Sequence, residues 1–157
     1  MNIIRSTQKS VGSITSLRYV LISDVSSFTT IMRFRPISLD EISLKNNVQW
    51  KKIYFTPETC SAESVSKDDD AGIFYTNSIE FEYHGENAET SNILEYLVNV
   101  PILVIATNLN GTERLFGTPQ NPVKLRYNQK TEKTVMQNTG YDVSISGNGI
   151  YPALFIC

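Results

Sequence analysis

The chain has 157 residues, a formal net charge of −2 and 41% hydrophobic residues. This length is typical of one domain with an ordinary core, so we expect a single domain over residues 1–157, and the patterns below indicate that it is β-rich. No segment approaches the roughly 20 apolar residues of a membrane span, so no membrane insertion is expected. The basic residues are scattered, which argues against an ordinary nucleic-acid-binding domain, because such domains depend on neutralising phosphates.

Four segments in the first half of the chain have the composition of strands. β-branched and aromatic residues are frequent in them, and polar residues bound them. They are residues 13–25, 28–34, 50–55 and 58–66. A short turn separates the first two, so we expect these two strands to pair. Residues 67–72 then form a turn.

Residues 35–49 break this pattern and are expected to form a long loop or arm. Pro36 removes a backbone donor and disfavours helix at Arg35. Residues 38–44 have a weak apolar side and the composition of one helical turn. Irregular segments of this length are uncommon inside compact domains unless they are functional or disordered. Two interpretations stay open: a surface loop, or an arm that docks on a neighbouring subunit.

The most regular stretch begins with a strand over residues 72–83. Its second half alternates between apolar and polar residues, which is typical of a half-buried strand. A helix over residues 88–99 follows, with Asn87 as a plausible cap and Pro101 as the stop. Its apolar stripe predicts a helix laid on the sheet as a lid on the core; the stripe consists of Ile93, Leu94, Leu97 and Val98.

A nearly continuous apolar strand then covers residues 101–107. Asn110-Gly111 is a strong hairpin signal, because both residues accept the positive φ angles of a tight turn. Residues 112–117 lead back as the partner strand.

The C-terminal part alternates again. We expect strands over residues 123–127, 132–137 and 140–146, with turns over residues 128–131 and 147–149. The last segment, residues 150–156, is apolar and is expected to pack on the core of its own chain, with packing on a partner as the alternative.

The sum is eight to ten strands and one helix. The fold class is therefore mainly β: an antiparallel β-sandwich or barrel with one α-helix packed against it.

No residue constellation predicts chemistry, and no catalytic, cofactor-binding or metal site is expected. His84 ends a strand at a turn, and no nucleophile elbow accompanies it. Glu80 and Glu82 share the polar face of one strand, which is often acidic without being catalytic. Residues 68–70 are three consecutive aspartates without the alternating ligands of a calcium loop, which indicates a solvated turn.

The two cysteines are expected to be inert. Cys60 has no basic neighbour in sequence to lower its pKa, and Cys157 is the last residue. The first residues lack the long apolar region of a signal peptide, so we expect synthesis in a reducing cytosol and no disulfide between the two.

The order of the central elements resembles small β-rich structural proteins from the tails and necks of tailed bacteriophages, particularly the tail-tube-like fold. The points of likeness are the strand 73–83, the helix 87–99, the apolar strand 102–107 and the Asn110-Gly111 hairpin. Two further runs are similar to uncharacterised phage and prophage proteins. These runs are residues 114–119 leading to 122–125, and residues 140–147 with 152–155.

The resemblance implies a ring-forming virion component in the tail or neck, made in the host cytoplasm and not an enzyme. It implies a homo-oligomeric ring of six- or twelvefold symmetry, contacts with other tail or neck proteins, and DNA passing through the lumen without specific binding. The face of Glu80 and Glu82 and the turn of residues 68–70 are the candidates for lining that lumen.

Two other functions stay open. One is a monomeric β-sandwich that binds a receptor or a carbohydrate on a phage tail, with Trp50 and the tyrosines as a sugar-stacking platform. The other is an enzyme with a pocket that gathers carboxylates around His84.

Overall fold

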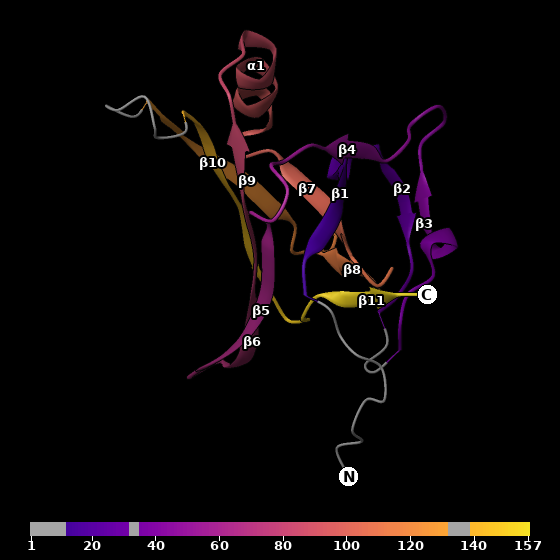
Figure 1. Cartoon of the computed structure of the whole chain (residues 1–157). Helices are drawn as coiled ribbons and strands as arrows, with labels where there is room; N and C mark the ends of the chain where they lie inside the picture. The colour runs from indigo at the N-terminus through magenta and orange to yellow at the C-terminus, as the bar shows by residue number, and fades with distance from the viewer. Residues whose placement is uncertain (1–11, 32–34, 132–138) are drawn as a thin grey trace.

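The computed structural model describes residues 12–31, 35–131 and 139–157. It is mainly β and antiparallel, with one α-helix in the described part of the chain (Figure 1). This confirms the predicted fold class. The strands are β1 (Ile14–Leu21), β2 (Val25–Phe28), β3 (Ile42–Leu44), β4 (Lys51–Ile53), β5 (Ser61–Asp69), β6 (Gly72–His84), β7 (Pro101–Asn108), β8 (Glu113–Phe116), β9 (Val123–Lys130), β10 (Gly140–Gly149) and β11 (Leu154–Ile156). The helix is α1 (Ala88–Leu97), and two short 3-10 helices are η1 (Ile22–Asp24) and η2 (Leu39–Glu41).

Nine strands form one sheet around β7. The main path runs β11-β8-β7-β9-β10-β6-β5, and a branch adds β1 and β4. Strand β7 pairs with β1 along one edge and with β8 and β9 along the other. The remaining strands, β2 and β3, form a separate two-stranded sheet. Strand β7 is therefore the element that joins the two halves of the large sheet.

Strand β7 is buried on both faces, which explains its continuous apolar sequence. Ile102, Val104 and Ala106 lie in an inner core, whereas Leu103 and Ile105 lie in a second core on the opposite face. All five are at most 2% exposed. The apolar run therefore still alternates between two faces, as a strand must, but both faces have cover.

The inner core lies between the β1-β7-β8 part of the sheet and the β9-β10-β6 part. In the ladder between β6 and β10, Ile79 faces Ile145 and Phe81 faces Val143, and all four are buried. Helix α1 covers one end of this core with Leu94 and Leu97. Its first turn is capped by Asn87, whose side-chain oxygen accepts hydrogen bonds from the backbone of Glu89 and Thr90. The predicted helix and its role as a lid are confirmed.

The second core changes the interpretation of residues 35–49. This segment forms η2 and β3, and Ile37 and Ile42 are only 3% and 5% exposed. Both pack against Leu103, Ile105 and other residues of the second core. The predicted helical turn is confirmed as η2. These apolar side chains cover β7 of their own chain, which corrects the expected surface loop, whereas docking of the segment on a neighbouring subunit stays a prediction.

The predicted pairing of the first two strands is also wrong. Strand β2 ends at Phe28 and pairs with β3, where Phe28 lies opposite Ile42. Strand β1 pairs with β4 and β7 instead. The physical reason is that β1 pairs with β7 along one edge and with β4 along the central part of the other, so the next strand in sequence has no open edge to join there. Residues 32–34 of the predicted second strand lie outside the described residues.

Three predicted turns are strand over most of their length, and only residues 70 and 71 of the first one turn. Strand β5 continues to Asp69, β9 to Lys130 and β10 to Gly149. The strand ladders extend past the cores, so backbone hydrogen bonds hold these ends as strand although no core covers them. Their side chains can therefore be polar. The predicted strand over residues 132–137 lies outside the described residues.

The predicted hairpin between β7 and β8 is confirmed. Gly111 has a φ of 82°, and its N–H donates to the Asn108 carbonyl. The C-terminal segment packs on its own chain as expected: Ala153 is buried, and Ile37 forms a bridge with Ile156 of β11. Within the described ranges, no helix is long and apolar enough to span a membrane.

The substitution Ile42→Ala tests whether residues 35–49 belong to the core. We expect a loss of about 2–5 kcal/mol in the free energy of unfolding, because the change removes buried methyl groups and leaves a cavity. Urea unfolding followed by circular dichroism measures this. Ser43→Ala on the same strand is the control, since Ser43 is exposed. Equal stability of the two variants would contradict the assignment.

Candidate functional site

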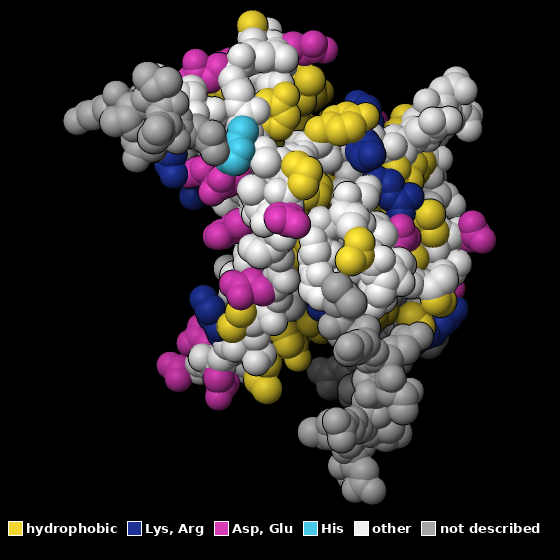
Figure 2. Space-filling model, in the orientation of Figure 1, with side chains coloured by type: hydrophobic (Ala, Val, Ile, Leu, Met, Phe, Trp, Pro, Cys, Tyr) yellow, Lys and Arg dark blue, Asp and Glu magenta, His cyan; other side chains and the backbone are white. Residues whose placement is uncertain are grey.

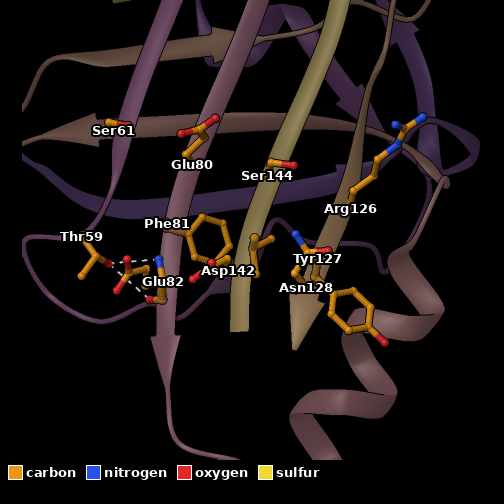
Figure 3. Close-up of a pocket in the computed structure, with 11 residues that line it drawn as sticks. Thr59, Ser61, Glu80, Phe81, Glu82, Arg126, Tyr127, Asn128, Asp142 and Ser144 are labelled. Atoms are coloured by element: carbon orange, nitrogen blue, oxygen red, sulfur yellow. Dashed lines mark hydrogen bonds between the residues drawn. The ribbon is translucent and has the colours of Figure 1, made fainter. Parts of the chain in front are cut away.

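A polar groove of about 520 Å³ crosses the outer face of β5, β6, β10 and β9 (Figure 3). The groove is lined by carboxylates, hydroxyls, an amide and a guanidinium. Its polar side chains are Thr59, Ser61, Glu80, Glu82, Arg126, Asn128, Asp142 and Ser144. Strand alternation explains its chemistry, because Glu80 and Glu82 point away from the core that holds Phe81. The structure thus brings the two predicted glutamates into one open, polar site.

Glu82 and Asp142, two acidic side chains of this groove, each have a nearby basic partner. Glu82 lies directly opposite Asp142 in the ladder, and like charges in that position destabilise a sheet. Each has a basic partner: His84 Nε2 lies 2.9 Å from a Glu82 carboxylate oxygen, and Lys130 pairs with Asp142. The predicted exposed position of His84 is confirmed. Its ring makes a surface hydrogen-bond contact with a carboxylate on its own strand.

The three aspartates at residues 68–70 are exposed at the tip of the β5–β6 hairpin. In the described part of the chain, no group of three or more His, Cys, Asp or Glu side chains could hold a metal ion. Hydrogen bonding here is local: the Asp70 N–H donates to an Asp69 carboxylate oxygen at 2.7 Å. This tip is an acidic, solvated point that projects from the sheet.

An apolar surface adjoins the acidic tip, and we name it the hairpin-end surface. It consists of Ile73 and Tyr75 on β6 with Ile150, Pro152 and Phe155, which line a groove of about 540 Å³. Ile73 is 64% exposed and Ile150 is 62% exposed. Figure 2 shows hydrophobic and acidic side chains gathered at this lower end of the molecule. Large apolar side chains in this setting mark interaction sites.

A buried polar network holds the hairpin-end surface in shape. Asn77 on β6 is buried, accepts a hydrogen bond from the Ser64 hydroxyl and donates to the Tyr151 carbonyl at 3.3 Å. The Ala153 N–H donates to Ser64 Oγ at 2.9 Å. These bonds fasten the C-terminal segment to the base of the hairpin and so fix the spacing between Ile73 and Ile150.

A second apolar surface lies at the other end of the molecule, beside α1 and β4, and we name it the helix-end surface. It consists of Lys51, Lys52, Tyr54, Ile93 and Tyr96. All five are exposed, and Tyr54 and Tyr96 reach 70% and 66%. Lys52 Nζ lies 5.1 Å from the centre of the Tyr54 ring, a cation–π contact. Figure 2 shows hydrophobic side chains beside basic ones at this upper end.

The helix-end surface encloses a groove of about 380 Å³ between α1 and β4. The floor of this groove is the inner core, including Leu94 and Leu97, and Lys51 and Lys52 lie among its lining residues. Tyr19 also lines it, and burial, with a smaller contribution from Tyr96, raises the pKa of the Tyr19 hydroxyl. The result is an apolar depression with a basic rim.

Two predicted candidates take no part in these sites. Trp50 is half-buried and packs against the second core, so it is not exposed as the sugar platform requires, whereas carbohydrate binding itself stays a prediction. Cys60 packs against the inner core, and burial raises its pKa to about 12. Both cysteines are free thiols. The raised pKa of Cys60 agrees with an inert thiol, and both expectations stay predictions.

Comparison with protein-family models, with curated proteins and with solved structures found no match to this chain.

The two cysteines give a test of the inner core. At pH 8 we expect iodoacetamide to modify Cys157 at least about tenfold faster than Cys60, because a raised pKa leaves little thiolate on Cys60 and the thiolate is the reacting form. Mass spectrometry of timed samples measures both rates. In urea the two rates should converge. Equal rates in the folded protein would contradict the burial of Cys60.

The substitution Asn77→Ala tests the buried network. We expect a loss of about 1–3 kcal/mol in the free energy of unfolding, because the Ser64 hydroxyl and the Tyr151 carbonyl lose a buried partner. Chemical unfolding measures it, and Ser66→Ala, at an exposed position of the neighbouring strand β5, is the control. A loss no larger than that of the control would show that the network does not fasten the segment.

Proposed function

We propose that the chain is a self-associating structural subunit, of the ring-forming kind found in the tail or neck of tailed bacteriophages. The observation that supports this most is the pair of exposed apolar surfaces at opposite ends of the molecule. Six of the large hydrophobic side chains that are about half or more exposed belong to them: Tyr54, Ile73, Ile93, Tyr96, Ile150 and Phe155. A monomer in water gains nothing from this arrangement, whereas an assembly buries both surfaces.

The two surfaces differ from each other, which favours a ring over a dimer. A twofold dimer uses one self-complementary surface on both subunits. Two different surfaces on one chain instead favour head-to-tail contacts, which form a ring when the rotation closes. The resemblance to phage tail and neck proteins agrees with this arrangement and with a location in the virion.

The polar face of β6, β10 and β9 suits a passive wall for DNA. The carboxylates of Glu80, Glu82 and Asp142 share this sheet with Lys124 and Arg126 of β9, and Arg126 lies in the same row as Glu80, with Ser144 between them. Mixed charge neither concentrates nor strongly repels phosphates, whereas specific or tight DNA binding requires a basic stripe. A subunit with this face towards the lumen would let DNA pass without holding it.

Self-association is the property to measure first. We expect the mass from light scattering to rise from monomer to a defined oligomer as concentration increases to about 1 mM, a range in which even a millimolar dissociation constant is detected. Negative-stain images of the same fractions should show rings or short tubes. Because the surfaces are apolar, raising sodium sulfate should increase the oligomer fraction.

A protein that stays monomeric over the whole range would contradict the proposal. The alternative, a receptor- or carbohydrate-binding module, would then have to use Tyr54 and Tyr96, the two most exposed tyrosines of the described residues. A glycan array would test it, with Tyr54→Ala as the variant that should lose binding.

A further inference from the structure

We propose that the acidic tip of the β5–β6 hairpin of one copy docks into the groove between α1 and β4 of the next copy, with Ile73 inserted into the groove. This inference deepens the proposed function and rests on it, because the partner is a second copy of the chain. It defines the tip as residues 68–73 and the receiving site as the helix-end surface.

The tip has the shape of an inserting element. Residues 65–73 are all exposed, and the two strands continue past the core as a narrow hairpin (Figure 1). Ile73 is the large aliphatic side chain nearest the turn, and its Cα pairs with that of Asp68. Because directly paired residues lie on one face, an aliphatic side chain and a carboxylate project together from the tip.

The groove has the matching chemistry. Its floor is apolar, with Leu94, Leu97 and Ile93 among its lining residues, so an inserted aliphatic side chain would be removed from water there. Lys51 and Lys52 stand at its rim, and both are exposed. Neither has an ion pair with an acidic side chain of its own chain among the described salt bridges. The two lysines can therefore pair with the aspartates of the tip, and Lys52 can do so while its Nζ stays over the Tyr54 ring.

Charge complementarity distinguishes this pairing from other ways of covering the two surfaces. The tip has Asp68, Asp69 and Asp70 with one lysine, Lys67, which pairs with Phe74 on the other face of the hairpin. The groove rim has two lysines, and the acidic residues of α1, Glu89 and Glu95, do not line the groove. Opposite charges favour tip against groove and oppose tip against tip or groove against groove.

The hairpin tip of one copy cannot enter the groove of the same copy. The hairpin tip and the α1–β4 groove lie at opposite ends of the molecule (Figure 1), so each contact joins two copies and leaves one tip and one groove free. Such a contact propagates until the ring closes.

Charge reversal tests the docking directly. Asp68→Lys with Asp69→Lys, or Lys51→Asp with Lys52→Asp, should each raise the dissociation constant of self-association at least about tenfold, because like charges then meet in the contact. All four changes in one chain should restore association to within about threefold of the unchanged protein. Sedimentation velocity measures the oligomer fraction. Lys45→Asp, at an exposed position outside both surfaces, is the matched control.

The outcomes separate the docking from the proposed function. If the unchanged protein associates and the paired reversals have no effect, or if the four changes together fail to restore it, the docking is overturned and self-association stands. If the unchanged protein never associates, both are overturned. Circular dichroism checks that each variant folds.

A cross-link gives a second test that does not depend on the reversed charges. Ile73→Cys with Ile93→Cys, in a Cys157→Ser background, should form a ladder of disulfide-linked oligomers under oxidised glutathione, because only adjacent thiols can form a disulfide. Ile73→Cys with Leu109→Cys is the control, since Leu109 is equally exposed but lies in neither surface. Equal ladders from the two pairs, or none from the first, would overturn the docking.

Discussion

The burial of β7 on both faces is the constraint on which the other elements depend. Its alternating side chains separate the inner core from the second core, and both cores need a layer to cover them. The strands β9, β10 and β6 with α1 cover one face, whereas β2, β3 and η2 cover the other. A two-stranded sheet such as β2–β3 is marginally stable by itself. It persists here because Ile37 and Ile42 pack on β7 and its neighbours.

The β5–β6 hairpin, unlike β7, is buried only near its base. Near its base, Ile79 and Phe81 lie in the inner core, but towards the tip the ladder continues without apolar cover. Strand β10 pairs with β6 only as far as Tyr75, so the last residues of the hairpin depend on β5 alone. The charges at the end of β5 oppose pairing with a stray strand. An exposed isoleucine on such a projection is unfavourable in water, and a partner that buries it removes that cost.

Local patterns predicted the elements well and their partners poorly. Alternation located β6 and β10, helical spacing with Asn87 and Pro101 located α1, and Asn110-Gly111 located the β7–β8 turn. The errors share one cause. The structure of residues 35–49 and the choice of partner for β2 both depend on contacts between segments that are distant in the sequence. Proline and polar residues made residues 35–49 resemble a loop, yet two isoleucines in it face a core that only the tertiary fold creates.

The two end surfaces were not predictable for a related reason. Ile73 continues the alternation of Ile79 and Phe81, so sequence alone assigns it to the core face, and only the point where the core ends makes it exposed. Tyr54 and Ile93 come from different elements, and the groove between them exists because α1 and β4 meet over the end of the inner core. The position of an exposed apolar surface depends on where the core ends, and this is a property of the whole fold.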